Sequence, residues 1–522
     1  MVRSSAVMAL GTVASRVTGL VRLVLQGAAL SSGLVASTYN TANTVPTSIS
    51  VLLVGGALNS VLVPQLVRAR AEHADGGRAH EQRLITLVLC VLGVGTVLAV
   101  LAARQIVSLY MPDSPHDHGA FELTVVLARF LLPQIFFYGL YAVLGQALNA
   151  RGRFGAMMWT PVLNNVILIS LFGLYLWLVA SPLTVTEVTP AQVRLLGIGT
   201  TAGIVVQALA LVPYLRAAGF RWRLRFDWRG AGLRKSVSAA RWTLLVMLAN
   251  QVAITVVTRY ANAADLQLPQ AGVGNTAYSY AQTIWILPQS IVTVSLITAL
   301  LPRLSRAAAE RRLDDVRADL SRGLRATGVV IVPAAFFFLA FGPQLAAMLF
   351  SHGSTDARPM GHMLQALALG LIPCSAQSLL LRGFYAFEDT RTPFWVALWI
   401  SAFNIALAIA CHLLLPETWA VTGMAAAYSV SYAIGVLVTA VWLRRRLAGR
   451  LDGKRLTRTY GKLTVAAGAA GAAGWAAAHA GSVALWGPVL ELVAGGGVML
   501  VLFLALARVL RIGELRILPG LR

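Results

Sequence analysis

Apolar runs of about 20 residues recur from one end of this 522-residue chain to the other. Each run is long enough to cross a hydrocarbon core about 30 Å thick. Because lipid offers the backbone no hydrogen-bond partners, such runs must form helices or a closed barrel. Barrel strands would alternate in polarity over about ten residues, whereas these runs are longer and uniformly apolar. The sequence therefore predicts an all-α integral membrane protein.

The composition agrees, because 57% of the residues are hydrophobic, only 12% are charged, and the mean hydropathy is +0.71. A soluble protein would carry about a quarter charged residues. The runs predict about fourteen transmembrane helices, at residues 5–28, 38–67, 84–103, 121–148, 156–180, 193–215, 236–261, 271–301, 326–350, 359–386, 393–414, 419–443, 461–480 and 486–508.

The net charge of +23 would suit a nucleic-acid-binding protein, but the basic residues lie in short segments between the apolar runs. That is where the positive-inside rule places them. If the N-terminus faces the cytoplasm, the outward-facing segments hold only Arg104, Arg194 and Arg358. The sequence thus predicts that both termini are cytoplasmic and that the partner is a lipid bilayer, with no nucleic acid.

Two short motifs recur at a nearly constant offset. Residues 63–72 (VPQLVRARAE) resemble 301–310 (LPRLSRAAAE) at an offset of 238, and Asn149–Arg151 resembles Tyr385–Phe387 at an offset of 236. Six predicted helices separate the copies, and an even number makes the repeats parallel. Such repeats are typical of transporters with two lobes and alternating access.

The repeat predicts three parts of the chain. Residues 1–216 form an N-terminal six-helix lobe, residues 217–445 a C-terminal six-helix lobe, and residues 446–522 two extra helices with a cytoplasmic tail. Helix 461–480 contains AAGAAGAAG at residues 466–474, a surface of small residues that lets another backbone approach closely. Packing within the chain is the expected use of this surface, with dimerisation as the alternative.

Sequence motifs typical of enzymes are absent. It contains no HExxH, P-loop or GxSxG motif, and its eight histidines show no metal-ligand spacing with a carboxylate. Cys90, Cys374 and Cys411 all fall in apolar runs and resemble small buried residues. We therefore expect a protein that is not an enzyme and that has no metal or other cofactor. Coupling to the membrane potential or to an ion gradient is left open.

Charge inside the predicted helices is the feature most informative about function. Six arginines lie there, namely Arg16, Arg22, Arg129, Arg241, Arg259 and Arg382. An ionisable residue in the membrane is costly and indicates a functional site. Of the Asp and Glu residues, only Glu491 is expected in a helix well away from the inner face. A bound anion, water or backbone carbonyls must then compensate the arginines, and guanidinium groups suit phosphate oxygens.

Depth separates these arginines. Arg16 is about 16 Å into its helix, and Arg22 lies toward the outer half, about 120° further round. Arg129 lies several residues from the outer end of its helix. Arg259 and Arg382 are nearer helix ends, as is Arg241, and snorkelling to the interface is the alternative explanation there. We predict a substrate site formed by Arg16, Arg22, Arg129, Arg259 and Arg382.

Four prolines sit deep in predicted helices: Pro46, Pro133, Pro288 and Pro373. Each removes a backbone hydrogen bond and can kink its helix. Pro46 and Pro288 are predicted hinges for alternating access. Static bends that shape a cavity are the alternative.

Several motifs resemble those of the MurJ (MviN) lipid II flippases, a family of the multidrug/oligosaccharidyl-lipid/polysaccharide exporter superfamily. The motifs are ASRVTGLVR at 14–22, ANTVP at 42–46, GGALNSVLVP at 55–64, LNARGRF at 148–154, LLPRLS at 300–305 and RGFYAFEDTRTP at 382–393. They fall in order at the expected helices, and the resemblance covers residues 5–445.

The resemblance implies a multi-pass protein of the bacterial cytoplasmic membrane. It would flip lipid II, the undecaprenyl-pyrophosphate-linked peptidoglycan precursor, from the inner to the outer leaflet by alternating access. Arg16 and Arg22 match the cavity arginines of the family's first helix and would hold the pyrophosphate. The two extra helices would form a groove for the lipid tail, and cell-wall synthesis proteins are candidate partners.

The sequence departs from the family pattern at several positions. The family's acidic residues are replaced at Leu23 and Ser37, an arginine at Ser50, and an Asp-Arg pair at Gln282 and Thr283. The site is therefore less basic. Another polyprenyl-linked glycan is the main alternative substrate. A cation-coupled drug exporter would need intramembrane carboxylates, and a non-transporting cell-wall scaffold would have no use for deep arginines.

Overall fold

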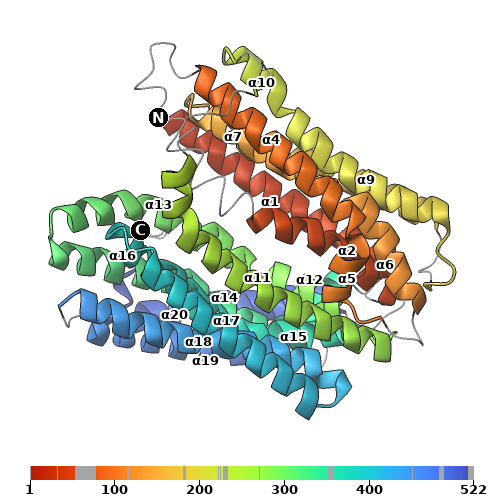
Figure 1. The fold of residues 1–522 in the computed structure, drawn as a ribbon. Helices are drawn as coiled ribbons and strands as arrows, with labels where there is room; N and C mark the ends of the chain where they lie inside the picture. Colours follow the sequence, from red (N-terminus) through yellow and green to blue (C-terminus); the bar gives the residue numbers. More distant parts are fainter. Residues whose placement is uncertain are drawn as a thin grey trace. The chain divides into compact units, whose positions relative to one another are not determined.

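The computed structural model describes residues 2–31, 33–52, 78–113, 118–153, 155–179, 184–220, 223, 225–226, 233–269, 271–350, 357–448, 451–480 and 487–514. Within these residues the regular secondary structure is entirely helical (Figure 1). This confirms the all-α fold class. The chain divides into two compact units, one formed by residues Met1–Leu266 and the other by the described residues from Gln267 onward.

The first unit contains α1 (Val2–Leu30), α2 (Leu34–Ser50), α4 (Arg78–Leu101), α5 (Ala103–Tyr110), α6 (His118–Leu131), α7 (Gln134–Asn149), α8 (Gly155–Leu178), α9 (Pro190–Leu209), α10 (Leu211–Ala217) and nearly all of α11 (Leu233–Gln267). The second contains α12 (Asn275–Trp285), α13 (Leu287–Ala309), α14 (Leu313–Phe350), α15 (Arg358–Ala368), α16 (Leu371–Ala386), α17 (Arg391–Leu414), α18 (Glu417–Arg446), α19 (Gly453–Ala478) and α20 (Pro488–Val509).

Each predicted helix overlaps one observed helix or a consecutive pair, although the second half of the helix predicted at 38–67 lies outside the described residues. Ten of the described helices are long and apolar enough to cross a membrane. Counting α15 and α16, which are bent by 45°, as one span gives up to eleven. The integral membrane class is thus confirmed, while the count of fourteen and the orientation of the termini stay predictions.

Prolines lie at several of the helix breaks. Pro133 follows Leu132 between α6 and α7, and Pro288 is the second residue of α13, just after the break at Ile286. Proline is well tolerated in the first turn of a helix, where its missing N–H would have no intrahelical acceptor. Pro46 differs, since it is buried inside the continuous helix α2.

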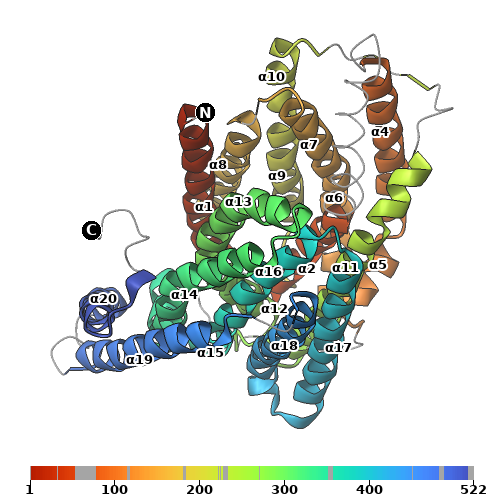
Figure 2. The same cartoon turned by 90° about the vertical axis from the view of Figure 1, so that its left-hand side faces the viewer.

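Aromatic side chains from several helices form the core of the first unit. Tyr39 of α2 and Phe172 of α8 meet edge to face with their ring centroids 5.9 Å apart, and Phe121 and Tyr175 are buried in the same cluster. In this unit α1 packs along α8 (Figure 2). The orientation of α1 is therefore set by α8.

Small residues hold α19 and α20 together in the second unit. Ala466, Ala467 and Ala470 are buried in a cluster with residues of α14 and α20, and α19 runs beside α20 (Figure 2). A Cβ atom on Gly474 would lie 2.5 Å from the carbonyl oxygen of Gly495. The predicted small-residue surface is thus used for packing within the chain.

This close packing leads to a stability prediction. Gly474→Ala should lower the free energy of unfolding by about 1–3 kcal/mol, because the new methyl group has to push two helix backbones apart. Gly497→Ala in α20 is the matched control, since a Cβ there meets nothing within 4 Å. Thermal unfolding of the purified protein in detergent should show a lower Tm for the first variant only. Equal Tm values would contradict the packing argument.

The turns after α7 and α16 show the same local geometry at an offset of 236 residues. In the turns 148–153 and 384–389, the amide of the sixth residue donates to the carbonyl of the first, at 3.0 and 3.1 Å. The fifth residues, Gly152 and Glu388, have positive φ angles of 71° and 58°. This is the offset between the recurring motifs Asn149–Arg151 and Tyr385–Phe387. The other pair of motifs cannot be compared, since residues 63–72 lie outside the described residues.

In both units an arginine contacts a phenylalanine ring next to this turn. The residue in the turn is the arginine in the first unit and the phenylalanine in the second. The guanidinium of Arg151 lies 5.2 Å from the ring of Phe220, and that of Arg446 lies 5.8 Å from the ring of Phe387. Arg151 and Phe387 are again 236 residues apart. These observations support parallel repeats. The predicted lobe boundaries at residues 216 and 445 stay predictions, and α11 packs with the first unit up to Leu266.

Candidate substrate-binding site

Asn165 of α8 fixes the position of α1 next to the first candidate arginine. Its amide nitrogen donates to the backbone carbonyl of Ser15 and to the hydroxyl of Thr18, both at 3.0 Å. Thr18 in turn donates to the carbonyl of Ala14 at 2.7 Å. Because these contacts bind one turn of α1, they also set the direction in which Arg16 points.

Arg16 is exposed on the surface of the first unit, beside the exposed apolar residues Val13 and Val17. At about 100° per residue it points well away from Ser15 and Thr18, and hence from α8. No carboxylate among the described residues forms an ion pair with it, and its charge lies among apolar side chains of a predicted span. An external anion or water must therefore compensate the charge.

Arg22 is half-buried one and a half turns further along α1. It lies near Tyr39 of α2 and Tyr138 of α7. Its Nε atom is enclosed, and no described residue accepts a hydrogen bond from it. Arg22 is thus a half-buried cation whose Nε has no acceptor among the described residues.

Polar side chains from several helices surround Arg22. The hydroxyl of Tyr39 lies 2.8 Å from that of Thr200 in α9, and that of Tyr138 lies near Thr47 of α2. Gln26 of α1 donates to Asn40 of α2 at 2.7 Å. A polar layer therefore crosses the first unit at the level of Arg22, as a site for a charged headgroup requires.

The other three candidate arginines have different surroundings. Arg129 is exposed in the last turn of α6, where a cation is stabilised by the helix dipole. Arg259 of α11 donates to the backbone carbonyl of Ser108 in α5. Arg382 of α16 lies in the second unit, 5.5 Å from the ring of Tyr385, with its Nε enclosed and without a partner among the described residues. The structure brings Arg16, Arg22, Arg129 and Arg259 into one unit, and their predicted roles stay predictions.

One buried carboxylate was missed by the sequence analysis. Helix α11 continues to Gln267, beyond the predicted end at residue 261, and Asp265 within it is fully buried. The hydroxyl of Ser37 donates to its carboxylate, and the neighbouring Asn262 accepts from Thr41 at 3.0 Å. The expectation that only Glu491 enters a helix far from the inner face is therefore wrong. The helix continues through the polar residues Asn262 and Asp265, for which α2 supplies hydrogen-bond partners.

The positions that depart from the family pattern can now be placed. Leu23 is buried, and the hydroxyls of Ser50 and Thr283 donate only to carbonyls of their own helices. Gln282 is half-buried. At Ser37, by contrast, a carboxylate is still present, because Asp265 of α11 reaches it.

Asp265 leads to a second stability prediction. Asp265→Ala should lower the free energy of unfolding by about 1–3 kcal/mol, because the buried hydroxyl of Ser37 in α2 loses its acceptor. Asp265→Asn keeps an acceptor oxygen and should lose less. Glu122→Ala is the control, since its ion pair with Arg104 is exposed and such pairs contribute about 0–1 kcal/mol. Thermal unfolding in detergent measures all three. An Asp265→Ala variant as stable as Glu122→Ala would contradict the role given to the carboxylate.

Comparisons with known proteins agree with this arrangement. A protein of Rhizobium meliloti (strain 1021) named "Probable lipid II flippase MurJ" is 29% identical over 83% of this chain and 79% of its own length. A protein of Haemophilus influenzae with the same name is 27% identical over 89% and 90%, respectively.

Solved structures show the same fold. "Lipid II flippase MurJ, inward closed conformation" superposes with a TM-score of 0.76 at 20% identity, covering 97% of this chain and 99% of that one. An inward-facing multidrug resistance MATE family transporter of the MOP superfamily superposes with a TM-score of 0.64 at 16% identity, covering 84% and 98%. The family model described as lipid II flippase MurJ matches residues 27–494. The chain therefore belongs to the MurJ family of lipid II flippases, multi-pass proteins of the cytoplasmic membrane.

Proposed function

We propose that this chain flips lipid II across the cytoplasmic membrane and that Arg16 and Arg22 of α1 hold the diphosphate. The observation that carries the proposal is the state of Arg22. Its Nε is enclosed and has no acceptor among the described residues, although Tyr39 and Tyr138 lie near. A phosphate oxygen is the acceptor that best fits a guanidinium group.

Arg16 supports the same assignment from a more open position. It is exposed on the unit, whereas Arg22 is half-buried. The two side chains leave α1 in directions about 120° apart and at levels about 9 Å apart. A lipid headgroup that moves along α1 would therefore meet one guanidinium after the other, and its diphosphate would keep a cationic partner along the way.

The membrane potential would favour outward movement. The cytoplasm is electrically negative, and moving one elementary charge across 100 mV is worth about 2.3 kcal/mol. A headgroup with several negative charges would therefore gain free energy on its way out. The potential would therefore favour transport from the inner to the outer leaflet and is a candidate driving force. No cofactor is required by this mechanism.

Alternating access requires helices that bend, and the proposed hinges are Pro46 and Pro288. Pro46 interrupts the hydrogen bonding of α2 from inside the helix, and Pro288 follows the break between α12 and α13. Both helices belong to the predicted repeat. We propose that they bend at these points when access changes from one side to the other.

A flippase for another polyprenyl-linked glycan is the second candidate function. It is favoured by the uncharged residues Ser50, Gln282 and Thr283, where the family pattern has charges. The same two arginines would serve, because such substrates share the diphosphate. The two functions differ only in the sugar and peptide that are carried.

Complementation tests the proposed function. The chain should restore growth of a bacterium depleted of its own lipid II flippase, and labelled lipid II should become accessible on the outer face. If the chain accumulates in the membrane but the depleted cells still lyse, the lipid II assignment is wrong. Restored export of a different polyprenyl-linked glycan would then identify the second candidate function.

A further inference from the structure

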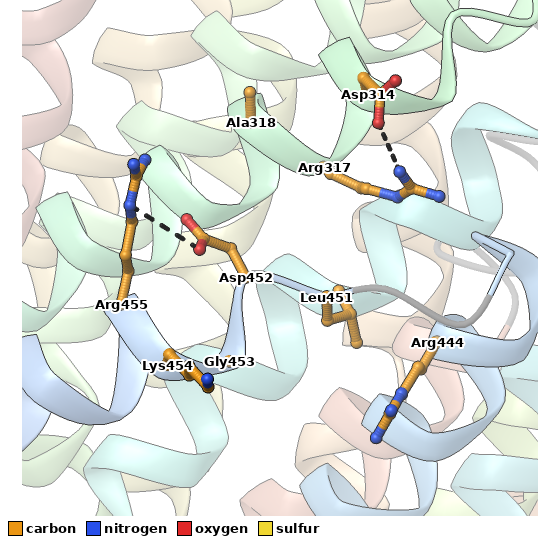
Figure 3. Close-up of a pocket in the computed structure, with 9 residues that line it drawn as sticks. All are labelled: Asp314, Arg317, Ala318, Arg444, Leu451, Asp452, Gly453, Lys454 and Arg455. Carbon is orange, nitrogen blue, oxygen red and sulfur yellow. Dashed lines mark hydrogen bonds and ion pairs between the residues drawn. The ribbon is translucent and has the colours of Figure 1, made fainter.

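A basic pocket lies in the second unit, where the start of α14, the end of α18 and the start of α19 meet (Figure 3). Its volume is 660 Å³. Four cations line it, Arg317, Arg444, Lys454 and Arg455, together with the carboxylates of Asp314 and Asp452. The pocket therefore has an excess of positive charge.

The carboxylates are already engaged within the pocket. Asp314 pairs with Arg317, and Asp452 lies 4.0 Å from Arg455 (Figure 3). Asp452 also accepts from Ser321 at 2.8 Å. Lys454 forms no ion pair with a described residue. The Nε of Arg317 is enclosed and also has no acceptor in the described part of the chain. Arg317 also donates to the backbone carbonyl of Leu447, so it contributes mainly its charge. Lys454 thus keeps its hydrogen-bonding capacity for an anion.

Backbone amides add to this capacity. Helix α19 begins at Gly453 in the wall of the pocket, and the side chain of the preceding Asp452 does not cap it. The first amides of a helix have no intrahelical acceptor, and together with the helix dipole they favour an anion. The amide of Gly453 donates to the carbonyl of Leu451 at 2.6 Å, so a phosphate in the pocket would meet the amides that follow it, beside Lys454.

An apolar groove of 1010 Å³ opens from the same place. It shares Leu451 and Gly453 with the basic pocket and continues between α16, α18 and α19. Ala426, Ala433 and Ala440 of α18 line it at seven-residue intervals, and their small side chains leave the groove wide. From the first of these alanines to the last, the groove runs about 21 Å along α18. Exposed leucine and valine side chains border it, as expected for a surface in contact with hydrocarbon.

We propose that the pocket and the groove together bind an anionic glycerophospholipid of the inner leaflet, a site separate from the arginines of α1. Its phosphate would lie between Arg317, Lys454 and the first amides of α19, and its acyl chains would lie in the groove. Basic pockets between membrane helices on the cytoplasmic side are typical sites for anionic headgroups. A groove of about 21 Å suits acyl chains of one leaflet, which is about 15 Å thick, whereas the much longer polyprenyl chain of lipid II would extend beyond it.

The corresponding place in the first unit shows that this pocket is not a simple consequence of the repeat. Arg78 and Glu81 lie 236 residues before Asp314 and Arg317. At both equivalent positions the charge has the opposite sign in the two units. There, Glu81 binds Arg151 with two hydrogen bonds of 2.7 Å, and the pocket measures only 290 Å³. The buried carboxylate satisfies the arginine in that unit. In the second unit the equivalent position carries Arg317, which pairs with Asp314, and the larger pocket leaves room for a lipid phosphate beside Lys454.

Lipid binding to the full-length purified protein tests the proposal. Native mass spectrometry should show tighter binding of phosphatidylglycerol than of phosphatidylethanolamine with the same acyl chains. Lys454→Ala should weaken phosphatidylglycerol binding about fivefold, the loss expected for one cation at a membrane surface. Ala433→Phe, which fills the groove, should weaken it as well. Two exposed residues outside the site give matched controls, Arg445→Ala for the charge and Val501→Phe for the groove.

Competitors distinguish the sources of phosphate. Inorganic phosphate at millimolar concentration should not displace the phospholipid, because it gains nothing from the groove. Equal binding of the two phospholipids would overturn the proposal, as would equal effects of Lys454→Ala and Arg445→Ala. Displacement by inorganic phosphate would show a soluble-anion site instead. Stronger displacement by undecaprenyl diphosphate, lost in Ala433→Phe, would assign the groove to the transported lipid.

Discussion

Arg16→Ala is expected to abolish flipping while the protein still inserts and accumulates in the membrane. Arg16 is exposed on the first unit, points away from α8 and has no carboxylate partner among the described residues. Removing it should therefore leave the helix packing intact, because the contacts of Asn165 with α1 involve Ser15 and Thr18 instead. What is lost is the charge that receives the diphosphate. The readout is growth of a flippase-depleted strain that carries the variant.

Two further variants separate charge from geometry. Arg16→Lys should restore function in part, because lysine keeps the charge but loses the planar fork that binds two phosphate oxygens. Arg508→Ala is the control for loss of a membrane arginine, since Arg508 is exposed in the last turn of α20 and can reach the interface. Normal growth with Arg16→Ala would show that the assignment of the site is wrong.

The helices could be predicted from hydropathy, but their ends often could not. The helix predicted to begin at residue 193 starts at Pro190, because Thr189 caps its N-terminus in a reciprocal capping box with Gln192. That signal is present in the sequence, as Thr-Pro-Ala-Gln. The extension of α11 to Gln267 is different, because the helix continues through Asn262 and Asp265 only where α2 and α5 supply hydrogen-bond partners. Tertiary contacts of this kind leave no trace in a local sequence window.

The candidate site could likewise be predicted only in part. The depth of Arg16 and Arg22 follows from counting residues along one apolar run, and the sequence alone gives it. Their neighbours do not follow, because Tyr39, Tyr138 and Asn165 come from three other helices. Which face each helix turns toward α1 depends on packing such as that of Tyr39 on Phe172. The sequence therefore predicts the candidate cations but not the polar groups that lie beside them.

The second large effect concerns the charge of the lipid headgroup. The protein should bind undecaprenyl diphosphate more tightly than the monophosphate, and the monophosphate more tightly than the alcohol. An arginine at the bilayer centre costs about 2.5–3.5 kcal/mol on the insertion scale. Two arginines therefore represent several kcal/mol that water must offset in the resting protein. A diphosphate replaces this water with charge-assisted hydrogen bonds worth about 1.5–3 kcal/mol each, whereas a neutral lipid displaces the water and returns nothing.

Arg22 should contribute most of this selectivity, because it is the more buried of the two arginines. Its Nε has no acceptor among the described residues, so the side chain gives up no hydrogen bond of that atom when it turns toward a phosphate oxygen. A single charge-assisted bond of about 1.5–3 kcal/mol corresponds to roughly 10- to 150-fold in affinity. Arg22→Gln should reduce the preference for diphosphate over alcohol by such a factor, and added salt should weaken binding only modestly, since a buried site is poorly screened.

Native mass spectrometry or a thermal-shift titration with the three lipids measures the preference, with Arg508→Gln as the control. Equal affinities for the three lipids in the unsubstituted protein would mean that the arginines of α1 serve insertion or folding, and the diphosphate site would have to be sought elsewhere in the chain.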